Sequence, residues 1–144
     1  MAGGLRIAVL KERASGETRV AATAETVKKF AALGAVVAVE KGAGAGAAIP
    51  DADFAAAGAQ LGSAAQVVAA ADIVLSVQGP ELKLLKGANA GAWIVGTLAP
   101  LAERARIDAY AKGGFEALAM EFMPRITRAQ SMDVLSSQSN LAGY

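Results

Sequence analysis

The sequence predicts an α/β domain with a three-layer architecture, in which helices cover both faces of an open parallel sheet. Short apolar runs alternate along the chain with amphipathic segments of helical period, as expected of parallel strands joined by helical crossovers. Hydrophobic residues make up 54% of the chain and aromatic residues only 5%, so the core must consist largely of small aliphatic side chains. The 144 residues are the size of a single domain, and we expect residues 1–144 to form one.

Local signals give the boundaries of each element. Short apolar runs between turn residues predict buried strands, while Gly34 and Gly113 end helices and Pro50 begins one. Five strands separated by helices, without long linkers, indicate a flavodoxin-like or Rossmann-like sheet. In chain order we expect a strand at residues 6–10, helix 23–33, strand 35–40, helix 51–58, helix 63–71, strand 72–77, strand 92–98, helix 101–111, strand 115–120 and helix 132–142.

Composition excludes several classes of function. Fourteen basic and thirteen acidic residues give a net charge of +1, so neither nucleic acid nor an anionic membrane surface is predicted as a partner. The chain has no cysteine and no histidine, which excludes thiol catalysis, disulfides and histidine bases, and no metal site is predicted. With no secretion signal and no apolar stretch of about 18 residues, we expect a cytoplasmic protein that does not insert into a membrane.

A glycine-rich loop follows the second predicted strand. Gly42, Gly44 and Gly46 match a loose dinucleotide-binding pattern, which would place a pyrophosphate at a helix N-terminus. However, the helix signal comes only at Pro50, and Asp72 begins its strand rather than ending one, far from a ribose. The pattern therefore favours a flexible surface turn over a phosphate-binding loop.

Charged residues follow the first predicted strand at its carboxyl end, the side where open sheets bind ligands. They are Lys11, Glu12, Arg13, Glu17 and Arg19. Charged loop residues are usually only solvated. A solvated loop and one wall of a cleft are both compatible with this pattern.

The densest group of polar side chains lies near residue 130. It offers enough hydrogen-bond donors and acceptors to bind a planar polar ligand such as a carboxamide, so its density favours a binding site. The alternative is that Ser131 or Asp133 caps a helix while the arginines pair with carboxylates such as Glu121. The group comprises Arg125, Arg128, Gln130, Asp133, Ser136 and Gln138.

These residues resemble the NAD(H)-binding alpha subunit of the proton-translocating NAD(P) transhydrogenase family. The specific portion of the resemblance is the string Arg-Ile-Thr-Arg-Ala-Gln-Ser-Met-Asp-Val-Leu-Ser-Ser-Gln at residues 125–138. Lys11-Glu12 and the Gly-Glu-Thr-Arg-Val-Ala string at residues 16–21 also match, although alanine dehydrogenase shares that N-terminal pattern. The resemblance spans nearly the whole chain.

The resemblance implies hydride transfer between NADH bound to this subunit and NADP+ on a partner component, coupled to proton translocation. It implies that Arg125, Asp133 and Ser136 hold the nicotinamide carboxamide. Gln130, which would reach toward the partner's NADP(H), and Asp133 are the candidates for a catalytic role. The cofactor-binding segment would comprise Arg125, Ile126, Thr127, Arg128, Gln130, Asp133 and Ser136.

In that family a second, Rossmann-type domain carries the glycine-rich fingerprint and most contacts to NAD. The resemblance therefore implies that residues 1–144 are the N-terminal domain of a two-domain subunit and are inactive alone. The implied partners are a membrane-spanning component, an NADP(H)-binding component and a second copy of the subunit in a homodimer. The complex would hold the domain on the cytoplasmic side of the inner membrane.

Two alternatives stay open at this point. An alanine dehydrogenase-like oxidoreductase would handle pyruvate with a lysine and a histidine. In this chain Ser76, Gln78 and Ala99 occupy the stretches that match those two residues, which counts against this alternative, whereas Arg19 is retained. A non-catalytic assembly module would keep the fold for subunit contacts alone.

Overall fold

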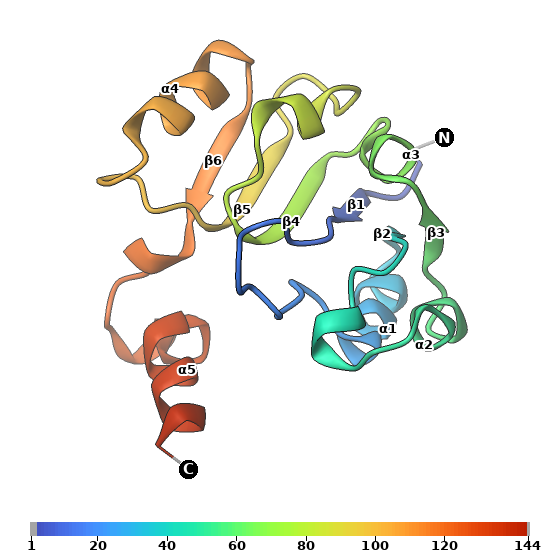
Figure 1. Cartoon of the computed structure of the whole chain (residues 1–144), viewed down its shortest axis with the longest axis horizontal. Coiled ribbons are helices and arrows are strands. Elements are labelled where there is room, and N and C mark those ends of the chain that lie inside the picture. The colour runs from blue at the N-terminus through green and yellow to red at the C-terminus, as the bar shows by residue number, and fades with distance from the viewer. Residues whose placement is uncertain (1–2, 144) are drawn as a thin grey trace.

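The sheet has six parallel strands, and the computed structural model describes residues 3–143 of the chain. Helices cover both of its faces (Figure 1). The three-layer α/β architecture predicted from the sequence is therefore confirmed. Tyr144, the last residue of the predicted domain, lies outside the described residues. The strands are β1 (Arg6–Val9), β2 (Val36–Glu40), β3 (Gln60–Gly62), β4 (Ile73–Gln78), β5 (Trp93–Thr97) and β6 (Glu116–Ala119).

The strand order is β3-β2-β1-β4-β5-β6, with every neighbouring pair parallel. The winding direction reverses between β1 and β4, and open α/β sheets bind ligands at such a reversal, beyond the carboxyl ends of the strands. The expectation of five strands was wrong because β3 was missed. Without β3 the order is that of a flavodoxin-like sheet, and with it the order becomes that of a dinucleotide-binding doubly wound sheet.

The helices begin at side chains that satisfy free backbone N–H groups. The Thr23 hydroxyl accepts from Thr26 N, and Ser63 and Gln66 form a reciprocal capping box. The third helix ends earlier than predicted because Ala70 has a left-handed backbone with φ of 56°. The helices are α1 (Ala24–Ala32), α2 (Asp51–Ala56), α3 (Ala64–Val68), α4 (Arg104–Lys112) and α5 (Val134–Ala142), with 3₁₀ turns η1 (Ala45–Ala47), η2 (Leu82–Leu85), η3 (Met120–Phe122) and η4 (Thr127–Met132).

Alternation along β1 builds one hydrophobic core on each face of the sheet. Ile7 and Val9 face α1 and α2, whereas Ala8 and Leu10 face α3 and α4. Tyr110 of α4 is fully buried in the second of these cores, and its hydroxyl donates to the carbonyl oxygen of Pro80. Burial raises the pKa of Tyr110 to about 12. The rigid core thus fixes the strand ends on which the candidate site is built.

Helix α5 lies outside the two covering layers. Figure 1 shows it beyond the carboxyl end of β6, with the C-terminal end of the helix directed away from the sheet. None of its residues is buried, and its contacts are mainly with η3. The position of α5 therefore depends on few interactions.

Candidate functional site

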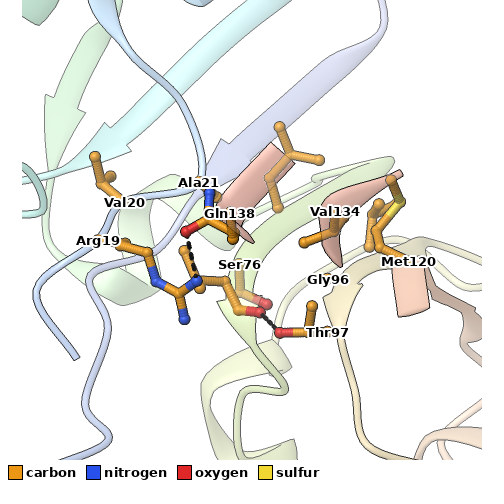
Figure 2. A pocket seen from close by; sticks show the side chains of 12 residues that line it. Arg19, Val20, Ala21, Ser76, Gly96, Thr97, Met120, Val134 and Gln138 are labelled. Atoms are coloured by element: carbon orange, nitrogen blue, oxygen red, sulfur yellow. Dashed lines mark hydrogen bonds between the residues drawn. The ribbon is translucent and has the colours of Figure 1, made fainter. Parts of the chain in front are cut away.

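A cleft lies at the carboxyl edge of the sheet, between the ends of β4, β5 and β6 and helix α5. It consists of two adjoining cavities. The inner pocket has a volume of about 380 Å³, and Figure 2 shows its lining. The outer pocket has a volume of about 350 Å³ and opens toward the segment after β6. Both pockets are lined by Arg19, Thr97, Met120, Val134 and Gln138.

Arg19 crosses this cleft. Its terminal nitrogen donates to Gln138 Oε1 on α5 at 3.1 Å, the contact drawn in Figure 2. The rest of its guanidinium group faces Glu17, which accepts from Arg19 Nε and from the second terminal nitrogen, each at 2.8 Å. Arg19 thus connects the loop after β1 with α5, and its charge is compensated within the chain.

The Glu17 carboxylate is the central acceptor of the hydrogen-bond network around Arg19. Its side chain is only 5% exposed, and it also accepts from Gln78 Nε2 at 2.8 Å and from Arg19 N at 3.0 Å. The hydrogen bonds from Arg19, followed by that from Gln78, lower the pKa of Glu17 to about 2. Glu17 is therefore ionised at neutral pH.

Glu12 attaches the same loop to β4. Its carboxylate accepts from the backbone N–H groups of Val77 at 2.6 Å and Gln78 at 3.2 Å. Burial raises the pKa of Glu12, and the two backbone hydrogen bonds oppose that effect. The carboxylate therefore satisfies two backbone donors at the carboxyl end of β4.

The other two cationic residues of the loop, Lys11 and Arg13, contact the end of β2 and do not line the cleft. Arg13 forms a bidentate ion pair with Glu40 at the end of β2, at 2.6 and 3.2 Å. The backbone N–H of Lys11 donates to the same carboxylate at 2.8 Å. Of the two interpretations of this loop, a cleft wall applies to Arg19, which Glu17 holds, whereas Lys11 and Arg13 join β1 to β2.

Ser76 lies at the floor of the inner pocket. The residue is 5% exposed, and among the described residues its hydroxyl has no hydrogen-bond partner. The hydroxyl of neighbouring Thr97, in contrast, donates to the carbonyl oxygen of Val77. A buried hydroxyl without a partner is uncommon, and this one lies beneath the surface of a mainly apolar pocket rather than open to it.

The outer pocket brings together two of the predicted carboxamide ligands, Arg125 and Asp133. Asp133 is the N-cap of α5, where it accepts from Ser136 Oγ at 2.6 Å and from Ser136 N at 3.2 Å. Those hydrogen bonds, with a smaller effect of the Arg125 charge, hold the pKa of Asp133 below its usual range. The predicted helix cap is confirmed, and a cation and a carboxylate line one pocket.

The other predicted site residues lie elsewhere. Ile126, Thr127, Arg128 and Gln130 belong to the segment entering or forming η4, where they are exposed and line neither pocket. The alternative interpretation, in which Arg125 and Arg128 pair with carboxylates such as Glu121, is wrong on that point. Within residues 3–143 no ion pair joins Arg125 or Arg128 to Glu121. The Glu121 carboxylate accepts instead from Leu98 N at 3.0 Å and Ala99 N at 2.8 Å, because η3 places it beneath the loop after β5.

The glycine-rich loop is a turn whose residues 45–48 are exposed, as predicted, but its glycines are tightly packed rather than flexible. Gly44 is buried, and a Cβ added there would lie 2.4 Å from the Ile49 carbonyl oxygen. A Cβ on Gly46 would lie 2.7 Å from the Thr18 carbonyl oxygen. Gly42 N already donates to Asp51 Oδ1 at 2.9 Å. The glycines are therefore explained by close backbone approach, and the chain's own carboxylate occupies the donor that a phosphate would need.

Two classes of feature are absent from the described residues of the chain. None of its helices is both long and apolar enough to cross a bilayer. No three acidic side chains in residues 3–143 converge on a point where they could hold a metal ion.

Several cleft residues were not singled out from the sequence. Thr97, Met120 and Val134 look like ordinary ends of strands and helices, and only the folded sheet brings them together. One signal was usable, since the carboxyl ends of neighbouring parallel strands share one edge. That rule would have selected Thr97 at the end of β5.

Sequence comparison relates the chain to a family and to longer proteins. The sequence model of the family described as alanine dehydrogenase/PNT, N-terminal domain, matches residues 8–142. An NAD(P) transhydrogenase alpha subunit of Rhodospirillum rubrum is 50% identical over 149 residues, covering 97% of this chain and 38% of that protein. The protein of the same description from Rickettsia prowazekii is 41% identical, again covering 97% of this chain and 38% of that protein. The chain thus spans 38% of the length of these two relatives.

Solved structures of the same kind share the fold. A transhydrogenase from Sinorhizobium meliloti superposes with a TM-score of 0.91 at 47% identity, covering 96% of this chain and 41% of that one. An L-alanine dehydrogenase superposes with a TM-score of 0.85 at 27% identity, covering 96% of this chain and 38% of that one. The match over residues 8–142, together with the six-stranded parallel sheet, shows that the chain belongs to the alanine dehydrogenase/PNT N-terminal domain family.

Proposed function

We propose that this domain forms one wall of the NAD(H) site in the alpha subunit of a proton-translocating NAD(P) transhydrogenase. The identities of 50% and 41% to transhydrogenase alpha subunits support that assignment. The observation that carries the proposal is that Arg125 and Asp133 line the same pocket at the ligand-binding edge of the sheet.

The chemistry of these two side chains fits a nicotinamide carboxamide. An amide needs a donor to its oxygen and an acceptor for its amino group, and Arg125 and Asp133 supply these in turn. Ser136 already occupies some of the acceptor capacity of the Asp133 carboxylate, whose two oxygens retain further acceptor sites. The lowered pKa of Asp133 keeps the acceptor ionised near neutral pH.

When bound, the nicotinamide ring would supply or accept the hydride. The protein needs no general base for that step, so its residues have to bind the ring, orient it and exclude water. The apolar lining of the cleft, including Met120 and Val134, suits a planar ring. Gln130, exposed on η4, is placed to meet the NADP(H)-binding partner in this proposal.

The remaining assignments belong to the same proposal. The partners are an NADP(H)-binding component, a membrane-spanning component and a second copy of the subunit. We propose that residues 1–144 alone are inactive, because one wall of a dinucleotide site lacks the phosphate-binding loop that provides much of the affinity.

A single-turnover assay tests the proposed function. The full-length protein, mixed with an NADP(H)-binding component, NADH and an NADP+ analogue, is expected to transfer hydride in stopped flow, and omission of the partner component should abolish the signal. Calorimetric titration of the full-length protein with NADH provides the second measurement. Absence of NADH binding would favour the assembly-module alternative instead.

The inner pocket is unsuited to an anionic keto acid. Arg19 is held by Glu17 and Gln138, and Glu12 adds a second carboxylate near the cation. We therefore expect the full-length protein to show no turnover with pyruvate, ammonia and NADH. Spectrophotometric NADH oxidation is the measurement, and steady oxidation that requires both pyruvate and ammonia would restore the alanine dehydrogenase alternative.

A further inference from the structure

Helix α5 is joined to distant regions of the described chain by a single hydrogen bond. Gln138 Oε1 accepts from Arg19 at 3.1 Å, across a sequence separation of 119 residues. The other hydrogen bonds of α5 in residues 3–143 stay within the helix or its N-cap. Since no residue of α5 is buried, this hydrogen bond contributes much of what fixes the position of α5 relative to the sheet.

The donor side of this bond is rigid. Glu17 fixes the Arg19 guanidinium group through two side-chain hydrogen bonds of 2.8 Å, and Gln78 fixes Glu17 through a third. Gln78 belongs to β4, and its backbone N–H is held by Glu12. A continuous chain of hydrogen bonds therefore runs from the central sheet to α5.

The acceptor side faces the cleft. Gln138 and Val134 are four residues apart on α5, so they share one face of the helix, and both line the inner and outer pockets. Asp133 precedes Val134 directly, and Ser136 lies in the same first turn. Movement of α5 relative to β4 would displace all of these groups together.

We propose that Arg19 is a positioning residue, which uses the Glu17–Gln78 network to hold α5 and thereby sets Asp133 at the outer pocket. The inference rests on the proposed function, because Asp133 is a carboxamide ligand of that proposal. Arg19 itself needs no contact with the cofactor or the transferred hydride. Its guanidinium fork suits this task, since it can bind Glu17 and Gln138 in one fixed geometry.

Hydrogen exchange in the full-length protein tests the tether without any assay of activity. Gln138→Leu and Arg19→Leu are each expected to speed amide exchange of α5 about tenfold, in keeping with loss of one charge-assisted hydrogen bond. The double variant should exchange no faster than Arg19→Leu alone, because Arg19→Leu already removes the bond to Gln138. Gln138→Glu retains an acceptor and should stay within about twofold of the original protein. Asn140→Leu is the matched control on the same helix, with no expected change.

Hydride transfer provides the second measurement on the same variants. Gln138→Leu should slow single-turnover transfer about tenfold with an NADH Kd changed less than about threefold, and Gln138→Glu should restore the rate. Unchanged exchange in Gln138→Leu and Arg19→Leu, or additive effects in the double variant, would overturn the positioning role. Faster exchange with unaltered hydride transfer would support the tether and would instead contradict the carboxamide clamp of the proposed function.

Discussion

Replacing Arg125 with alanine, or Asp133 with asparagine, is expected to slow hydride transfer by the full-length protein about 10–1000-fold. Each change removes a charge-assisted contact worth about 1.5–3 kcal/mol, and the loss of ring orientation adds to that effect. Asparagine caps helices about as well as aspartate, so Asp133→Asn should keep the start of α5 while it removes the charged acceptor. Arg125 lines the same pocket, so both variants test one clamp.

Stopped-flow transfer between NADH and an NADP+ analogue measures this effect. Arg104→Ala and Asp108→Asn are the matched controls, because they make the same chemical changes in an exposed ion pair on α4, away from both pockets. Exposed pairs of this kind contribute little to stability, so their rates should equal that of the original protein. If Arg125→Ala and Asp133→Asn also stay within about twofold of that rate, these residues do not form the clamp.

Most of the fold could be predicted because the strands that form the core are apolar and of ordinary length. The run predicted at residues 35–40 became Val36–Glu40, and that at 92–98 became Trp93–Thr97. Strand β3 escaped prediction because it has three residues and begins with exposed Gln60. Its strand conformation comes from pairing with β2, where Gln60 lies opposite Ala38. Such pairing is a tertiary interaction that periodicity does not record.

The start of α4 shows the same limit. A helix was predicted from residue 101, but α4 begins at Arg104. Ala99 adopts a left-handed backbone with φ of 47°, and Glu103 N donates to its carbonyl oxygen at 2.8 Å. The intervening residues form a turn instead of a first helical turn. Alanine gives no sequence signal for a left-handed conformation, which is usually a property of glycine.

The candidate site could be predicted where it is local. Arg125, Asp133 and Ser136 fall within a dozen positions, so a cluster of polar residues in the sequence became a cluster in space. Arg19 and Gln138 are separated by 119 residues, and only the fold brings their side chains within 3.1 Å. The sequence therefore indicated the residues that we propose for the clamp, but not the hydrogen-bond network that links Arg19 to α5.

The glycine-rich loop allows a second, structural prediction. Gly44→Val is expected to lower the free energy of unfolding by about 3 kcal/mol, because overpacking of a close-packed site strains its neighbours. The added Cβ would lie 2.4 Å from the Ile49 carbonyl oxygen and 2.8 Å from Phe54 Cε2. Phe54 is fully buried in the core under α2, so it has no room to yield. The valine side chain would therefore clash with both the backbone at Ile49 and the core at Phe54.

Urea unfolding, followed by circular dichroism, measures this loss as a lower midpoint. Gly3→Val is the matched control, because a Cβ at Gly3 would meet nothing within 4 Å. A calorimetric titration of the full-length protein with NADH, at a temperature where both variants are folded, should give one Kd for all three proteins, since the loop is explained by packing and Asp51 already binds Gly42 N. A Gly44→Val protein that unfolds at the original urea concentration yet loses NADH would show that the loop holds the pyrophosphate after all.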